Sequence, residues 1–293
     1  MVGQSVEVAC GQWTDRGRFE HTARSLLLTM FGELVVPAGQ PARTASLLYV
    51  LTGLGISEPA ARQALARAAE AGWLVSQRQG RETWWHATST LTGLVEDITV
   101  EVGAFNAATT STGDWDRTGL IVHVSVPTHQ AALRKELYSA LRHLGFGNPS
   151  AGLWLSPRTG RLPEVSALIQ HLGLRDRTSV FIGRLAPVGL TESELLERGW
   201  ELDDLTAHYR TLVQTYSTLN PRPGDELLFT YLRLVDCWRA FPPLDPRLPP
   251  DLPADWPGHH AAELYVWRRA RWKPAARQHW HHITLLHTSG VHP

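Results

Sequence analysis

The segment Gly55–Leu74, GISEPAARQALARAAEAGWL, restricts the fold of this chain more than any other stretch. Ser57 suits the N-cap of a helix, Pro59 is tolerated in a first turn that needs no backbone donor there, and Gly72 suits the end. Helical projection places small apolar side chains on one face, namely Ala61, Ala64, Leu65 and Ala68. The sequence therefore predicts a helix that packs very close to its neighbours.

The opposite face of this predicted helix lacks bulky apolar side chains and is partly basic. It carries Gln63, Ala66, Arg67 and Glu70, with Arg62 on its flank. Directly after it, WLVSQRQGRETWWHAT predicts two short strands around a Gln79–Gly80 turn, flanked by Arg78 and Arg81. Arginines far outnumber acidic residues over this stretch, which indicates local attraction of a polyanion.

Two more helical patterns precede this segment and one follows the hairpin. TARSLLLTMFGELV repeats apolar residues at helical spacing until Pro37 and Gly39 interrupt it. ARTASLLYVLTGLG predicts a second helix that ends at Gly55, and a further helix is expected from about Ser89 to Phe105. Three helices followed by a basic hairpin is the order of a winged helix-turn-helix. We therefore expect an N-terminal tail over residues 1–21 and a DNA-binding domain over residues 22–105.

A winged helix-turn-helix inserts the N-terminal part of its third helix into the DNA major groove. Groove contacts are therefore expected from Glu58, Ala60, Arg62, Gln63 and Arg67, and the cap residue Ser57 is also expected to contact the DNA. Contacts of the hairpin with the backbone or minor groove are expected from Arg78, Gln79 and Arg81. Arg43 and Thr44, which start the preceding helix, are candidate phosphate anchors. The alternative is that these arginines form a solvated face that binds nothing.

The middle of the chain predicts a small α/β unit. NAATTSTGDWD, residues 106–116, has the small polar composition of a linker. The strands TGLIVHVSV, AGLWLS and TSVFIGRLA then alternate with the helices THQAALRKELYSALRHLG and LPEVSALIQHLG. This alternation favours a ferredoxin-like dimerisation unit over residues 113–188. Its first strand ends without the aspartate that binds metal in ferredoxin-like CRISPR-associated nucleases, so we expect no catalysis.

Residues 189–293 predict a mostly helical C-terminal domain interrupted by the proline-rich loop PPLDPRLPPDLPADWPG. HHAAELYVWRRARW and PAARQHWHHITLLH predict two closing helices. Basic and aromatic residues alternate there, which suits an anionic ligand or nucleic acid. The alternative is an amphipathic helix with buried tryptophans and solvated arginines. The candidate ligand-binding residues are Arg268, Arg269, Arg271 and Lys273, whereas His279, His281 and His282 lack partners at metal-ligand spacing.

Composition excludes several classes of protein. Cys10 and Cys237 are far apart and form neither a disulfide framework nor a metal-binding pair, which suits the cytoplasm. No apolar run is long enough to span a membrane, and the N-terminus lacks a signal-peptide pattern. G-x-S-x-G, Walker A and G-x-G-x-x-G motifs are absent. We therefore expect no enzyme, no metal, no cofactor and no membrane partner. The fold class expected is α+β.

Three segments in order resemble the PaaX family of transcriptional repressors, which control phenylacetic acid catabolism. The first is SLLLTMFGEL followed by GISEPAARQALARAAEAGWLVSQRQGRETWWHAT, which resembles the winged helix of the family. The second is LRKELYSALRHLGFGNPSAGLWLSP, which resembles its central unit. The third is VDCWRAFPPLDPRLPPDLPADWPG, which resembles its C-terminal signature. The resemblance extends over nearly the whole chain after about residue 22.

The resemblance implies a homodimer on double-stranded operator DNA with inverted half-sites, and release when a small-molecule effector binds. In the best-known members the effector is phenylacetyl-coenzyme A, so an aryl- or acyl-CoA thioester is expected. The arginines near Arg268 would suit its phosphates. Two alternatives stay open: a metal-dependent ferredoxin-like nuclease tethered to DNA, and a ligand-independent DNA-binding activator.

Overall fold

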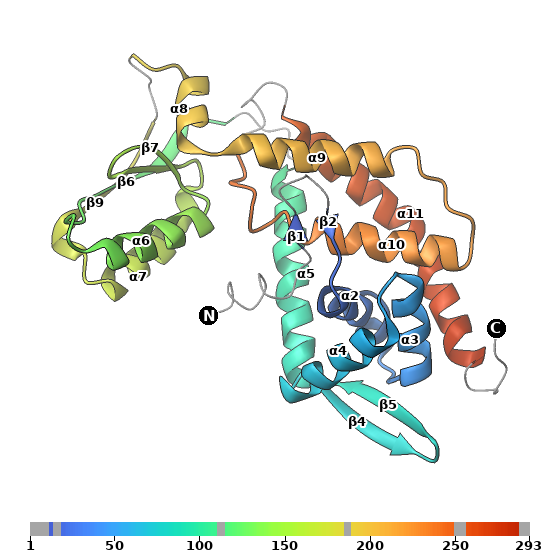
Figure 1. The fold of residues 1–293 in the computed structure, drawn as a ribbon. Helices are drawn as coiled ribbons and strands as arrows, with labels where there is room; N and C mark the ends of the chain where they lie inside the picture. Colours follow the sequence, from blue (N-terminus) through green and yellow to red (C-terminus); the bar gives the residue numbers. More distant parts are fainter. Residues whose placement is uncertain (1–11, 14–18, 110–114, 185–188, 249–255, 287–293) are drawn as a thin grey trace. The chain divides into compact units, whose positions relative to one another are not determined.

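The structure, a computed structural model of the 293-residue chain, describes residues 12–13, 19–109, 115–184, 189–248 and 256–286. It divides into two compact units (Figure 1). Unit 1 is built from Met1–Asn106, Thr211–Pro242 and Glu263–Pro293, and unit 2 from Ala107–Arg210 and Pro243–Ala262. Helices and small antiparallel sheets occur in the chain, in agreement with the predicted α+β class. Cys10 lies outside the described residues.

Unit 1 begins with a small antiparallel pair, β1 (Gln12–Trp13) and β2 (Phe19–Glu20). Three helices follow: α2 (Ala23–Met30), α3 (Thr44–Gly53) and α4 (Glu58–Glu70). Thr22 caps α2 in a capping box with Ser25. The first helical pattern does not stay α-helical, because a π-helical turn (η1, Phe31–Val35) and a 3-10 turn (η2, Val36–Ala38) end it before Gly39.

The apolar face predicted for α4 is confirmed. Ala61, Ala64, Leu65 and Ala68 are all buried, and their small size lets α4 approach both α2 and α3. Ser57 occupies the N-cap with extended backbone, but its side chain accepts no capping hydrogen bond. Leu47, Leu48 and Leu51 of α3 are buried. Figure 1 shows the helices α2–α4 gathered together, with the hairpin extending from them.

The hairpin consists of β4 (Leu74–Gln79) and β5 (Glu82–Ala87). Its two-residue turn is Gly80–Arg81, one residue later than predicted, because Gln79 pairs with Glu82. Gly80 adopts φ 63°, which glycine tolerates without a steric penalty. A third strand, β3 (Ala42–Arg43), pairs with β5 to give the order β3-β5-β4. The prediction that these two residues start the second helix was therefore wrong.

Helix α5 (Ser89–Thr109) is longer than predicted. Leu91, Val95, Ile98 and Phe105 are buried along one side. The residues 106–109 continue the helix, so the predicted linker was wrong over this part, and 110–114 lie outside the described residues. Asn106 explains the extension in part, since its Oδ1 accepts a hydrogen bond of 2.9 Å from Trp238 Nε1.

The helices α9 (Leu202–Tyr216), α10 (Asp225–Trp238) and α11 (Pro257–Leu286) follow later in the chain. The prediction of two closing helices was wrong, because α11 is one helix of 30 residues with Pro274 inside it. Helix α10 is buried along most of its length. The Trp238 ring stacks on Tyr265 of α11 at 4.6 Å and contacts Phe105 of α5 at 5.6 Å, so unit 1 has one aromatic core shared by these helices.

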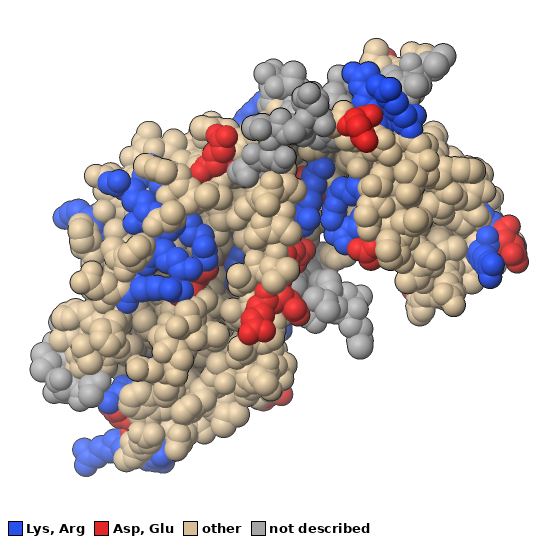
Figure 2. Space-filling view, turned by 180° about the vertical axis from the view of Figure 1, so that it is seen from behind, with Lys and Arg blue, Asp and Glu red and all other residues tan. Residues whose placement is uncertain are grey.

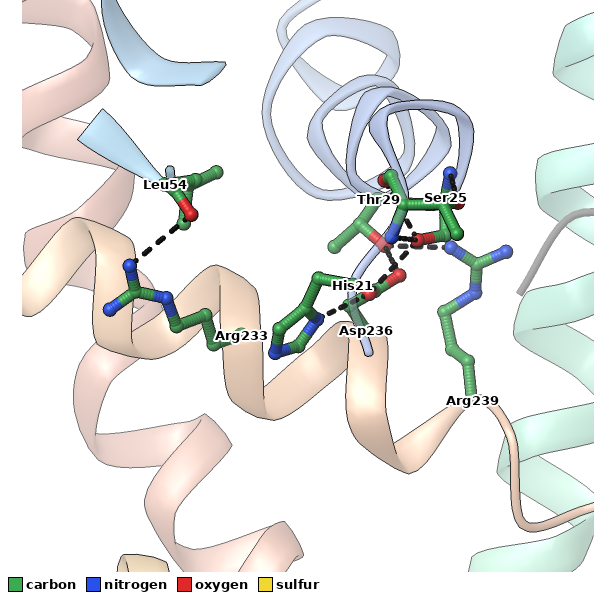
Figure 3. A network of polar contacts seen from close by, with 8 residues as sticks. His21, Ser25, Thr29, Leu54, Arg233, Asp236 and Arg239 are labelled. Carbon is green, nitrogen blue, oxygen red and sulfur yellow. Dashed lines mark hydrogen bonds and ion pairs between the residues drawn. The ribbon is translucent and has the colours of Figure 1, made fainter. Parts of the chain in front are cut away.

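A buried carboxylate joins α10 to the N-terminal helices. Asp236 is 0% exposed, and its oxygens lie 2.6 Å from His21 Nδ1, 3.1 Å from Ser25 Oγ and 3.1 Å from Thr29 Oγ1. Figure 3 shows these three side chains directed at Asp236, with Arg239 beside them. Arg239 donates to Thr29 Oγ1 at 2.7 Å. The cost of burying the charge is offset by these partners, so α2 is fixed on α10.

Unit 2 contains β6 (Thr118–Val124), α6 (Ala131–His143), β7 (Gly147–Ser150), β8 (Leu153–Ser156), α7 (Leu162–His171) and β9 (Thr178–Arg184), with short 3-10 turns η3 (Thr159–Arg161) and η4 (Arg175–Arg177). The antiparallel sheet has the order β7-β8-β6-β9. Its buried core includes Trp154 of β8, Leu137 and Leu141 of α6, and Val165 and Ile169 of α7. Figure 1 shows α6 and α7 side by side against one face of this sheet.

The strand β7 was missed by sequence reading, because Gly-Asn-Pro-Ser has the composition of a turn. It forms because α8 (Glu192–Gly199) packs beside it. A Cβ atom on Gly147 would lie 2.5 Å from the Trp200 ring, so only glycine fits at this contact. The proline-rich segment over residues 242–248 forms no helix or strand, as predicted.

The described helices include none that is both long enough and apolar enough to cross a membrane.

The Asp236 network predicts a strong local effect of one substitution. Asp236→Ala leaves the buried Thr29 hydroxyl without its acceptor and the His21 ring without its carboxylate partner, so opening of α2 and α10 should become easier by about 3 kcal/mol. Native-state hydrogen exchange of the α2 and α10 amides measures this. Asp97→Ala, an exposed change on α5, is the control and should shift those amides by less than about 0.5 kcal/mol. Equal protection in both variants would contradict the prediction.

Candidate nucleic-acid interface

The outer face of α4 is exposed along its whole length. Gln63, Ala66, Arg67 and Glu70 are exposed, as the projection predicted. Arg62 donates from Nε to Glu58 Oε1 at 2.9 Å, with both side chains more than half exposed. An exposed ion pair of this kind contributes little stability, so Arg62 can exchange Glu58 for another anion at small cost. Arg67 has no such internal partner among the described residues.

The hairpin tip is the second exposed basic element. Arg78, Gln79, Gly80 and Arg81 are all exposed. Arg78 Nε donates to Gly80 O at 3.3 Å, which holds that side chain over the turn. The tip thus presents two guanidinium groups at the exposed end of the two-stranded hairpin.

Arg43 and Thr44 lie apart from this exposed set. The Arg43 side chain is 11% exposed, pairs with Glu82 at 2.7 Å and stacks over the Trp84 ring at 4.4 Å. Thr44 Oγ1 donates to Thr83 O at 3.0 Å and accepts from Trp85 Nε1 at 2.9 Å. These two residues therefore fix the start of α3 to β5, and Arg43 is occupied by contacts within the fold.

Sequence reading missed a basic residue beside α4. Arg24 of α2 is exposed, and its guanidinium lies 4.6 Å from the centre of the Trp73 ring. Arg24, Gln63 and Arg67 line the same surface depression of about 250 Å³. Arg24 occurs in an apolar helical run with no neighbouring charge, so no local pattern could have indicated its position.

A second carboxylate, that of Asp225, links α3 to the C-terminal helices. Asp225, at the start of α10, accepts from Tyr49 Oη at 2.6 Å and lies 2.7 Å from His279 Nε2 of α11. The hydrogen bond to Asp225 raises the pKa of Tyr49 to about 12, with help from burial. Burial opposes ionisation of Asp225, but the bonds from Tyr49 and His279 outweigh it and lower its pKa. The helix before α4 is thus held by both C-terminal helices.

Comparison with known families decides where this chain belongs. Residues 22–91 match the description PaaX-like protein, residues 112–195 match PaaX protein central Cas2-like domain, and residues 200–282 match PaaX-like protein C-terminal domain. The chain belongs to the PaaX family. The resemblance noted from its sequence is therefore confirmed.

Two individual proteins resemble this PaaX-family chain. It is 29% identical over 264 residues to the transcriptional repressor PaaX of Escherichia coli (strain K12), covering 86% of this chain and 81% of that protein. The solved structure of uncharacterized protein Rv0674 from Mycobacterium tuberculosis is similar with a TM-score of 0.60. That comparison has 21% identity and covers 89% of this chain and 98% of the other. At this identity the similarity supports only the fold.

The basic cluster of α11 is only partly on the surface. Arg268 is 6% exposed, lies over the rings of Trp267 and Trp272, and donates to Ser217 O at 2.5 Å. Trp267 is 53% exposed. The alternative of buried tryptophans and solvated arginines is therefore wrong at these two positions, because Arg268 donates to a backbone carbonyl and lies over two tryptophan rings.

Glu33 of η1 interacts with three basic residues of α11. Arg269 lies 2.7 Å from one of its carboxylate oxygens and Lys273 lies 3.3 Å from the other. Arg277 Nε donates to the Glu33 backbone carbonyl at 3.0 Å, and Tyr231 Oη donates to the carboxylate. Arg269 and Lys273 thus hold α11 against η1, whereas Arg271 is exposed. Figure 2 shows Lys and Arg side chains gathered over this part of the molecule.

Burial opposes ionisation of Glu33, but its pKa is lowered because the charge and hydrogen bonds of Arg269 and the Tyr231 hydroxyl stabilise the carboxylate. Burial also lowers the pKa of Lys273, and repulsion from Arg269 and Arg277 works in the same direction against the attraction of Glu33. Among the described residues, Arg269, Lys273 and Arg277 meet the one carboxylate of Glu33, so the basic side chains there outnumber the acidic one.

The histidines of α11 do not point to one common site. His279 contacts Asp225, while His281 and His282 are exposed. The rings of His279 and His282 lie 6.2 Å apart. Among the described residues no group of three or more His, Cys, Asp or Glu side chains is arranged to hold a metal ion.

The lowered pKa of Glu33 predicts an acid-dependent stability. Its ionised form stabilises unit 1 fully above about pH 4.5, and this contribution is lost as pH falls through the lower native pKa. Glu33→Gln should therefore lower the thermal midpoint at about pH 7, and the difference from the parent should shrink towards about pH 3. Scanning calorimetry across this range measures it, with Glu96→Gln as the exposed control on α5. A constant difference would contradict the assignment.

Proposed function

We propose that this chain is a sequence-specific DNA-binding transcriptional repressor that acts in the cytoplasm. The observation that carries the proposal is the exposed outer face of α4, with Arg62, Gln63 and Arg67, next in sequence to an exposed basic hairpin tip. The name of the Escherichia coli relative, transcriptional repressor PaaX, supports it. A helix whose outer face lacks bulky apolar side chains can enter a major groove, where arginine donates hydrogen bonds to guanine and phosphate.

The order of the elements supports the finer fold assignment. The sequence α2, α3, α4, β4, β5 with β3 on the far side of β5 is that of a winged helix-turn-helix, here over residues 22–105. The order β7-β8-β6-β9 with both helices on one face is that of a ferredoxin-like unit, here over residues 113–188. Residues 189–293 form the helical C-terminal domain in this proposal, and 1–21 precede the DNA-binding domain.

The proposed DNA contacts follow the exposure of each side chain. Arg62, Gln63 and Arg67 read the groove with Glu58 and Ala60 at its edge, after the Ser57 cap, and Arg78, Gln79 and Arg81 contact the backbone. Arg24 joins them, because it borders the same depression as Arg67. Arg43 and Thr44 position β5 and α3 instead of anchoring phosphates, since their polar groups are used within the fold.

This assignment predicts which substitutions weaken DNA binding. Arg67→Ala and Arg62→Ala should each reduce affinity about tenfold or more for a duplex selected from a random pool, and each lost phosphate contact should reduce the salt slope by about 1. Fluorescence anisotropy at several salt concentrations measures both quantities. Lys135→Ala, an exposed change on α6 of unit 2, is the matched control and should leave affinity unchanged. Equal binding by all three variants would contradict the groove assignment.

The central unit is proposed to join two copies of the chain, so that a dimer meets two inverted half-sites. Its Cas2-like description also favours one other candidate, a metal-dependent nuclease. In this chain β6 ends at Val124 and Ser125 follows, so the strand end supplies no carboxylate. Cleavage of labelled DNA or RNA with Mg²⁺ or Mn²⁺ would support the nuclease instead.

Release by an aryl- or acyl-CoA effector is the last part of the proposal. Arg271 is the exposed cation of α11 that can meet a CoA phosphate, whereas Lys273 and Arg269 pair with Glu33. Arg268 leaves the proposed set, because Ser217 and two tryptophans already enclose its guanidinium.

Phenylacetyl-CoA, added to the complex with a selected duplex, should lower DNA affinity at micromolar concentration. Arg271→Glu should weaken this response about tenfold, because it replaces an attractive charge with a repulsive one. Lys135→Glu is the matched charge reversal and should leave the response unchanged. A complex that does not respond to the thioester would favour the ligand-independent activator.

A further inference from the structure

A pocket of about 210 Å³ lies within unit 1, between the base of the hairpin and the C-terminal part of α11. The η2–β3 segment contributes Pro37, Ala38 and Pro41 to its wall, and α11 contributes Trp280 and Leu285. Most of this lining is apolar. The pocket is therefore suited to the hydrophobic body of a small molecule.

One charged group lining this pocket is available to a ligand. Arg277 donates from Nε to Glu33 O at 3.0 Å, which fixes its guanidinium, and among the described residues its terminal amino groups have no partner. Arg43 also lines the pocket, but Glu82 neutralises it. A fixed guanidinium with two free donors is the geometry that binds a carboxylate in bidentate fashion.

The charge around Arg277 strengthens this argument. Arg269, Lys273 and Arg277 gather at Glu33, which supplies one carboxylate to three cations in the described part of the chain. The excess positive charge is partly shielded from water, since the Arg269 and Lys273 side chains are 32% and 27% exposed. A ligand anion would relieve the repulsion between these cations, and its attraction is stronger there than in bulk water.

We propose that this pocket binds a small aromatic monocarboxylate, with the carboxylate on Arg277 and the ring against Trp280 and the prolines of the η2–β3 segment. The pocket is too small for a whole CoA thioester, and a thioester carbonyl has no charge to pair with Arg277. The site is therefore distinct from the effector interaction proposed above. Its wall includes β3 and Trp84 of β5, the strands from which the hairpin extends.

The test is isothermal titration calorimetry of the full chain with 2-naphthoate and its neutral analogue 2-naphthamide. We expect saturable binding of the acid, and at least about tenfold weaker binding of the amide, because only the acid pairs with the guanidinium. Arg277→Gln should reduce naphthoate affinity to that of the amide. Arg222→Gln, an exposed charge removal elsewhere in unit 1, is the matched control and should change affinity by less than about twofold.

A second variant keeps the test independent of the fold of α11. Ala38→Trp, at an exposed position of η2, should fill the pocket and abolish binding of both compounds while the thermal midpoint stays unchanged. Equal affinities for acid and amide, naphthoate binding that neither variant alters, or no saturable binding up to about 10 mM would overturn the proposal. The titrations contain no DNA, so this failure leaves the proposed repressor function untouched.

Discussion

Burial of Asp236 at the contact between α10 and α2 fixes the N-terminal helices of unit 1 in place. A carboxylate with 0% exposure is tolerated only where donors surround it, and His21, Ser25 and Thr29 meet it from one short stretch of chain. The position of α2 on α10 follows from this match. Because α4 packs its small alanines on α2 and α3, the exposed face of α4 is also set by this contact.

Glu33 and Asp225 repeat the same principle at two other points. Glu33 ties η1 to α11 through Arg269 and Lys273, and Asp225 ties α3 to α11 through Tyr49 and His279. Basic and aromatic residues that look in sequence like a ligand-binding cluster therefore serve largely to join the C-terminal helices to the N-terminal ones. The surplus of cations left around Glu33, next to an apolar pocket, is what makes an anionic ligand chemically reasonable there.

The helices and most strands could be predicted from the sequence, because apolar spacing, caps and glycine breaks are local signals. Ala61, Ala64, Leu65 and Ala68 were predicted as the buried face of α4 and are buried. The strand β7 could not be predicted, since Gly-Asn-Pro-Ser pairs only because α8 and Trp200 cover it. The sequence predicts a break at Pro274, yet α11 is continuous there, with Trp272 and Ala276 buried on either side of the proline.

Motifs and local apolar spacing were enough to predict the family, most of the helices and the exposed basic face of α4, because each of these signals comes from residues close together in the chain. The role of each charged side chain became clear from the fold, because it depends on which residues pack around that side chain. Arg43 meets Glu82 and Trp84, Arg268 lies between two tryptophans, and Arg24 reaches Trp73. The sequence shows which residues are charged. Whether a charge is neutralised depends on residues far away in the chain that the fold brings next to it.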